Sequence, residues 1–154
     1  MRRKLSITRD DFENWLIVFD EDLDRFLATL PVETRAPLDY SPESLDVLET
    51  WILKNYPNTD SILAKDQMLI LDGLTRYIGE TYRKALGGIW TINLTDTKDA
   101  FYGLPILTKY ESPLGVEICP VTLATASADR RTGHYLRTVL DNYLRARNAR
   151  NQSQ

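Results

Sequence analysis

The chain has 154 residues, of which 43% are apolar and 27% are charged, a composition typical of a globular domain with a core of its own. Its single cysteine and single histidine exclude an internal disulfide and any metal site that needs several of these residues. Its formal net charge of −3 argues against a dedicated nucleic-acid-binding protein. The length predicts one domain over residues 1–150, followed by a frayed tail over residues 151–154.

The N-terminal half has the spacing of amphipathic helices. Apolar residues recur every three or four positions, which predicts three helices, over residues 10–30, 41–56 and 61–86. Thr8 and Asp11 have the spacing of a capping box for the first helix, and Ser41 and Ser61 are expected to cap the other two. Gly73 and Gly79 lie inside the third helix. Each costs about 1 kcal/mol relative to alanine in a helix, so we expect a neighbouring element to approach closely there.

The C-terminal half changes character. Alternating and β-branched residues predict a small antiparallel meander of about three strands, over residues 89–94, 104–108 and 116–118. Pro120 opens either a short helix or a turn through Ser127. A last helix is expected from about Arg130 to Ala149, capped by Asp129, with the polar residues from Asn148 onward fraying. The predicted fold class is α+β: three N-terminal helices, a small sheet and a closing helix.

The N-terminus does not resemble a targeting segment. Basic residues open the chain, but the nearest apolar run, residues 15–19, is shorter than the roughly 7–15 residues of a signal peptide. No window approaches the roughly 20 apolar residues of a membrane span. We therefore expect a cytoplasmic protein that does not associate with membranes.

Charge is segregated along the chain. The segment 10–72 has a net charge of −11, whereas residues 1–9 and 129–154 each carry +4 and residues 73–128 are neutral. In a structural interpretation, the acidic and basic parts lie against each other or are solvated. In a functional interpretation, the acidic surface meets a basic protein partner, since opposite charges steer association.

The densest polar and aromatic stretch contains Tyr77, Glu80, Arg83 and Trp90. One interpretation is an ion pair between Glu80 and Arg83 at helical spacing, beside a buried tryptophan. The other is that Glu80 pairs with a distant arginine and organises a pocket or contact surface.

A second polar stretch contains Arg130, Arg131 and His134 at the expected start of the last helix. Adjacent arginines at a helix N-terminus repel its positive dipole, so they need acidic partners such as Glu80. Alternatively, they form an anion site with the helix amides, binding a phosphate or carboxylate. No glycine-rich phosphate-binding motif follows a predicted strand, so no cofactor is expected. Nothing in the sequence indicates an oligomeric state.

A longer pattern joins Gly79-Glu80, Gly87-Gly88-Ile89-Trp90 and the segment Phe101-Tyr102-Gly103-Leu104-Pro105. It resembles a pattern in small uncharacterised bacterial proteins, some of which look like immunity proteins of bacterial toxin systems. The resemblance covers about residues 71–135. It implies a bacterial source and a protein-binding role, and it transfers no catalytic residue.

Three hypotheses follow from the sequence, and the third of them is a structural subunit of an oligomer. The leading one is a non-enzymatic, immunity-like protein-binding module whose acidic helices are the contact surface. The alternative is an anion- or ligand-binding domain, or an enzyme, that uses Glu80 with Arg83, Arg130 and Arg131. The residues expected at an interaction surface or pocket are Tyr77, Glu80, Arg83, Trp90, Tyr102, Arg130, Arg131 and His134.

Overall fold

A computed structural model describes residues 7–153 and confirms the α+β class. Within this range, eight α-helices and one short 3-10 helix accompany a two-stranded antiparallel sheet. The elements are α1 (Arg9–Ile17), α2 (Phe19–Thr29), α3 (Val32–Arg35), α4 (Ser44–Asn55), α5 (Thr59–Ile62), η1 (Lys65–Gln67), α6 (Met68–Leu86), β1 (Ile89–Thr91), β2 (Ile106–Thr108), α7 (Pro120–Arg130) and α8 (Tyr135–Gln152). None of the described helices combines the length and the apolar character of a membrane span.

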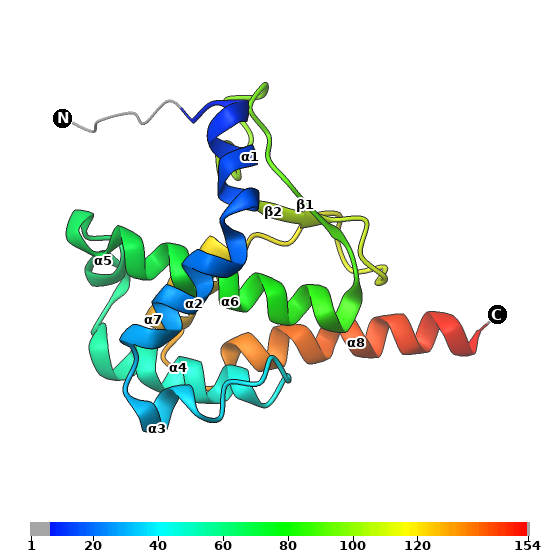
Figure 1. Ribbon diagram of the computed structural model, residues 1–154. Coiled ribbons are helices and arrows are strands. Elements are labelled where there is room, and N and C mark those ends of the chain that lie inside the picture. Colours follow the sequence, from blue (N-terminus) through cyan, green and yellow to red (C-terminus); the bar gives the residue numbers. More distant parts are fainter. Residues whose placement is uncertain (1–6, 154) are drawn as a thin grey trace.

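Helix α6 runs through the middle of the molecule, with α1 and the sheet on one side and α4 and α8 on the other (Figure 1). Its buried face includes Leu74, Tyr77, Ile78 and Tyr82, each fully inaccessible to solvent. These side chains belong to one apolar cluster that also receives side chains from α2, α4, α7 and α8. The central helix therefore holds the N-terminal helices, the sheet and the closing helix in a common core.

The predicted first helix over residues 10–30 is wrong in one respect, because it breaks at Val18 into α1 and α2. The guanidinium of Arg76 donates from Nη1 to the carbonyl oxygen of Trp15 at 2.9 Å. In a continuous helix this oxygen accepts the amide of Phe19. The break is thus stabilised by a buried arginine on α6, whereas the expected capping box of Thr8 and Asp11 is confirmed.

The predicted helix over residues 61–86 begins later than expected, at Met68. Ser61 lies within the separate short helix α5, where it completes a capping box with Asn58. The close approaches expected at the two glycines are present. A Cβ built on Gly73 would lie 2.1 Å from the ring of Phe26, and one on Gly79 would lie 2.0 Å from the ring of Trp90.

The expected third strand is also wrong. β1 and β2 pair with Trp90 opposite Leu107, but residues 116–118 contribute only one isolated bridge, in which Ile118 and Leu107 exchange both hydrogen bonds. The pairing stops there because Pro120 has no N–H and occupies the first turn of α7. Residues 120–127, for which the sequence allowed either a helix or a turn, therefore belong to helix α7.

The boundary between the last two helices differs from the prediction. Helix α7 extends through Arg130, Arg131 adopts a left-handed conformation with φ of 57°, and α8 begins at Tyr135. Asp129 therefore lies in the last turn of α7 and does not cap α8. Helix α8 continues through Gln152, past the expected end near Ala149, and Gln154 lies outside the described residues.

Candidate functional site

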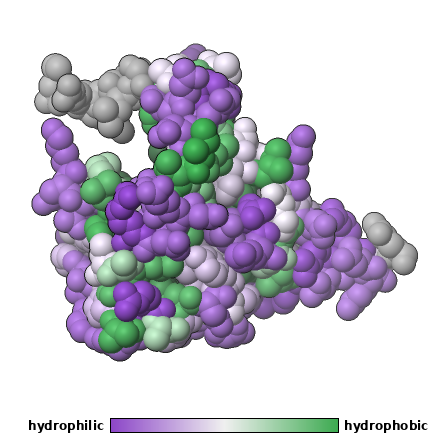
Figure 2. Space-filling view, in the orientation of Figure 1, coloured by the Kyte–Doolittle hydropathy of each residue, from purple (hydrophilic) through white to green (hydrophobic). Residues whose placement is uncertain are grey.

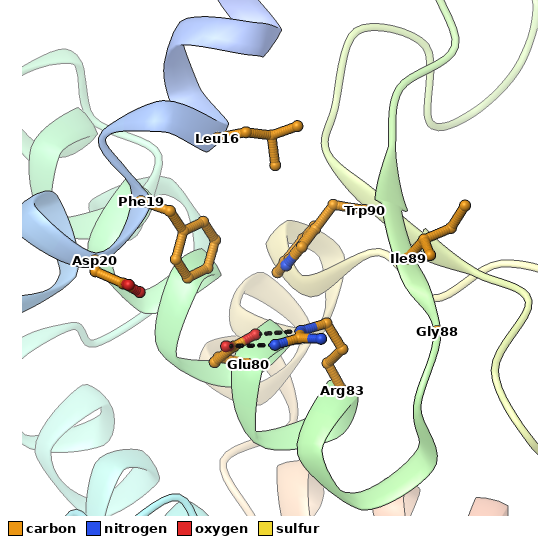
Figure 3. Close-up of a pocket in the computed structure, with 8 residues that line it drawn as sticks. All are labelled: Leu16, Phe19, Asp20, Glu80, Arg83, Gly88, Ile89 and Trp90. Carbon is orange, nitrogen blue, oxygen red and sulfur yellow. Dashed lines mark hydrogen bonds and ion pairs between the residues drawn. The ribbon is translucent and has the colours of Figure 1, made fainter.

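An open pocket of about 390 Å³ lies between the break of α1 and α2, the C-terminal half of α6, and β1 (Figure 3). Four elements line it, namely α1, α2, α6 and β1. Leu16, Phe19 and Asp20 form one wall, Glu80 and Arg83 lie on α6, and the remaining lining residues are Gly88, Ile89 and Trp90. The helix break places Phe19 and Asp20 at the start of α2, where both face α6 and β1.

Two of the predicted site residues, Glu80 and Arg83, form a bidentate ion pair on α6. Arg83 donates from Nε and Nη2 to the two carboxylate oxygens of Glu80, at 2.6 and 3.0 Å. The hydrogen bond to Glu80 raises the pKa of Arg83. The carboxylate is only 13% exposed and the guanidinium side chain is 41% exposed. Glu80 thus pairs with an arginine one turn away, so the pairing with a distant arginine is wrong.

Trp90 forms the apolar side of the pocket. Its ring lies edge-on to Trp15 at a centroid distance of 5.0 Å and tilted against Phe19 at 5.5 Å. It also lies over Gly79, where a side chain would collide with it. Its indole Nε1 is buried, and no described residue accepts a hydrogen bond from it. Gly79 therefore leaves the space that the ring of Trp90 occupies.

The side chains that line the pocket carry a net formal charge of −1, from Asp20 and Glu80 against Arg83. Asp20 is exposed at the pocket margin. Burial raises the pKa of nearby Tyr40 to about 12, and Tyr77 together with the carboxylates of Asp24, Glu80 and Asp20 contributes to that rise. The excess of one carboxylate over the cations in the lining favours a cation over an anion in the pocket.

Tyr77 and Tyr102 do not line this pocket. The hydroxyl of Tyr77 accepts a hydrogen bond from the main-chain N–H of Tyr40 at 2.9 Å and lies 2.7 Å from the hydroxyl of Ser44, so it joins α6 to the start of α4. Tyr102 lies in the loop before β2, where its amide bonds to the carbonyl of Asp99.

Arg130 and Arg131 lie at the end of α7, where the helix dipole is negative and favours a cation. The guanidinium of Arg131 donates to the carbonyls of Tyr56 and Leu53, each at 2.8 Å, and so caps the end of α4. Arg130 lies over the ring of Tyr135 at 5.0 Å. No ion pair within residues 7–153 joins either arginine to Glu80, which corrects the expected grouping.

The first amides of α8 are occupied by a residue that the sequence analysis missed. Glu49, fully buried on α4, accepts from the amides of Tyr135 at 3.1 Å and Leu136 at 2.8 Å. These amides therefore do not form the anion site proposed from the sequence. The sequence did contain a signal that Glu49 is buried, because it lies on the same helical face as the apolar residues Leu45 and Ile52.

His134 immediately precedes α8 and is 72% exposed. Its Nδ1 lies 3.2 Å from Oδ1 of Asp46, whose other oxygen accepts from Arg137 at 3.2 Å. His134 thus belongs to the contact between α4 and α8. It lies apart from the pocket at β1.

A second pocket, of about 410 Å³, lies between α1, the start of α6 and the loop before β2. Its lining is mainly apolar and includes Phe12, Trp15, Leu71 and Val121. Asp72 reaches it too, but its two oxygens are engaged by Trp15 Nε1 and Arg76 Nε, each at 2.7 Å. Asp11 also lines it, and its Oδ2 accepts the amide of Thr8 as part of the capping box of α1.

Within residues 7–153, no three His, Cys, Asp or Glu side chains lie in an arrangement that could hold a metal ion. Comparison with protein-family models, curated proteins and solved structures finds no match. The resemblance to immunity proteins stays a prediction. Of the eight predicted site residues, the pocket brings together Glu80, Arg83 and Trp90, and it adds Asp20, Phe19 and Leu16.

Proposed function

We propose that this chain is a protein-binding module whose contact surface is the α1–α2 face and whose partner is a basic protein. The observation that carries the proposal is the pairing of exposed apolar and exposed acidic side chains on this face. Leu16 is 36% exposed and Ile17 is 81% exposed at the end of α1. Figure 2 shows this apolar patch over the lower end of α1, next to the strongly hydrophilic surface of α2.

The acids of α2 are only partly neutralised. Arg25 contacts Glu21 at 3.3 Å and Asp22 at 3.0 Å. Among residues 7–153, no cation forms an ion pair with Asp20 or Asp24. An apolar patch with a charged rim is the usual composition of a protein interface, and the negative rim selects a positive partner. The resemblance to immunity proteins supports the same interpretation.

The experiment compares the wild type with two doubly substituted variants. D20K/D24K reverses charge on the proposed surface, whereas E33K/D60K makes the same change at exposed acids of α3 and α5. Each protein is used to capture binding partners from the organism that encodes it, and a captured protein is then purified and its affinity measured. We expect D20K/D24K to weaken binding at least tenfold and E33K/D60K to change it less than twofold.

Salt provides the second measurement. Interactions between exposed charges are screened beyond about 8 Å at physiological ionic strength and about 3 Å at 1 M. We therefore expect the affinity for the purified partner to fall as sodium chloride is raised. A partner that binds equally well at all salt concentrations and to both variants would overturn the proposal.

A further inference from the structure

The strand β1 pairs with β2 on one side and has an open edge on the other. The hydrogen bonds of β2 show which main-chain groups of β1 face that open edge. Leu107 exchanges both of its main-chain hydrogen bonds with Ile118, at 2.8 and 3.0 Å, so its polar groups point away from β1. Along a strand the main-chain groups alternate in direction. Ile106 and Thr108 therefore face β1, and they pair with Thr91 and Ile89.

Trp90 is consequently the residue of β1 whose main-chain N–H and C=O point to the open edge. No described residue makes a hydrogen bond to either group. An open strand edge with unpaired main-chain groups is a template for an added strand. Because β1 has three residues, an added segment is anchored chiefly by two bonds to Trp90.

The pocket lies on the side-chain face of the same residue. Directly opposed residues of neighbouring strands project their side chains to the same face of a sheet. A residue paired with Trp90 therefore projects toward Phe19, Asp20 and Glu80, the residues that line the pocket beside Trp90 (Figure 3). The strand edge and the pocket thus define one combined site.

The chemistry of this combined site favours arginine. A guanidinium stacks on aromatic faces and forms forked hydrogen bonds to carboxylates, which a lysine ammonium does not do. A carboxylate has about four acceptor positions, and Arg83 uses two of those on Glu80. Glu80 thus retains capacity for a second guanidinium, and Asp20 is exposed at the pocket margin.

We propose that an extended segment of the basic partner adds to the open edge of β1 and inserts an arginine side chain, opposite Trp90, between Asp20 and Glu80. This inference rests on the proposed function and specifies how the partner is recognised. The main chain of the segment bonds to Trp90, its guanidinium meets the two carboxylates, and the stem of the arginine packs on Phe19 and Trp90.

The test uses a synthetic peptide observed by NMR on the full chain. The peptide is acetylated and amidated, with a central arginine between two valines and terminal threonines. Two analogues carry citrulline in place of arginine, or an N-methyl group on the main-chain nitrogen of the arginine. We expect the arginine peptide to shift the amide and indole signals of Trp90 and to bind about fivefold more tightly than the citrulline peptide, since one partly exposed charge contact contributes up to about that factor.

N-methylation blocks the main-chain bond, so the methylated peptide should lose most of its binding. Trp90 signals that do not move, or equal binding by all three peptides, would overturn the inference. The exposed Asp20 allows a variant that leaves the core intact: D20N should reduce the preference for arginine over citrulline to below about twofold. The control D24N, on the same helix but outside the pocket, should keep the preference.

The outcomes separate this inference from the proposed function. In one outcome, a partner binds in a salt-sensitive way that depends on the α2 acids, but the arginine, citrulline and N-methylated peptides bind equally. This outcome refutes the strand-edge site and leaves the protein-binding role intact. Peptide discrimination in a protein whose partner binding is unchanged by D20K/D24K refutes the role assigned to the α2 surface. Because Asp20 belongs to both sites, this outcome also refutes the use of the arginine site by that partner.

Discussion

The buried carboxylate of Glu49 offers the sharpest test of how this fold is held together. It lies on α4 with no exposed surface, and it accepts the first two amides of α8 at 3.1 and 2.8 Å. The N-terminus of a helix carries partial positive charge, which stabilises the anion. Replacing Glu49 by alanine removes the acceptors of the buried Leu136 amide and the part-buried Tyr135 amide, and it leaves space where the side chain was.

The expected magnitude follows from the two bonds. A hydrogen bond to a charged group contributes about 1.5–3 kcal/mol, and an unsatisfied buried donor incurs a similar penalty. We therefore expect Glu49→Ala to lower the free energy of unfolding by about 3–5 kcal/mol, out of the roughly 5–15 kcal/mol typical of a domain. Glu49→Gln keeps one acceptor oxygen in place, so its cost should be about half as large.

Urea unfolding followed by circular dichroism measures these changes, and hydrogen exchange at Tyr135 and Leu136 locates them. The matched control is Glu43→Gln, which removes a carboxylate that is 66% exposed and 3.6 Å from Arg137. That change should cost less than about 1 kcal/mol. If Glu49→Ala costs no more than the control, or if the two amides stay equally protected, the assignment of Glu49 as the cap of α8 is refuted.

Three further predictions concern the pocket and the helix ends. Gly79→Ala should destabilise the protein by about 1–3 kcal/mol in thermal unfolding, because the added Cβ lies 2.0 Å from Trp90; an unchanged or raised melting temperature would contradict this. Arg131→Ala should cost about 1–3 kcal/mol through the lost caps on α4, whereas Arg130→Ala should stay within about 0.5 kcal/mol in the same assay. Burial raises the pKa of the Cys119 thiol, so its reaction with a thiol reagent should begin at higher pH in the folded protein than in urea, and equal profiles would refute the burial.

Local features were predictable from the sequence because they depend on neighbours in the chain. The capping box of Thr8 and Asp11 involves residues three apart, and the helical spacing of apolar residues locates most of α4 and α6. The glycines of α6 were correctly interpreted as close approaches, since no other physical reason offsets their cost in a helix. The residues that approach them, Phe26 and Trp90, are known only from the tertiary structure.

The errors arise where a distant side chain overrides a local pattern. The apolar stripe runs continuously through residues 10–30, yet Arg76 captures the carbonyl of Trp15 from 61 positions away and stabilises a break. Arg130 and Arg131 were expected at the start of the last helix, where their charge is unfavourable, but they lie at the end of α7. Arg131 finds its carbonyl partners at the end of α4, at Leu53 and Tyr56. Neither partner is detectable from spacing along one chain.

The part of the candidate site that comes from one stretch of sequence was predicted, whereas the part that comes from a distant helix was not. Glu80, Arg83 and Trp90 lie within eleven residues of one another, so one polar-aromatic stretch revealed them. Asp20 and Phe19 reach the pocket only because α2 starts a new direction after Val18. The break that the sequence did not reveal is thus what completes the pocket.

The segregated charge of the sequence divides into two parts in the structure. The basic residues of α8 are partly used within the fold, since Arg137 contacts Asp46 and Glu43 from the side of α4. The structural interpretation of the charge pattern therefore accounts for the acids of α4. It does not account for those of α2, where, among the described residues, Asp20 and Asp24 have no ion-pair partner. Repulsion between these neighbouring carboxylates opposes folding, and a basic partner seated on α2 would relieve it. Binding strength that falls with salt should therefore depend on the α2 acids and not on those facing α8.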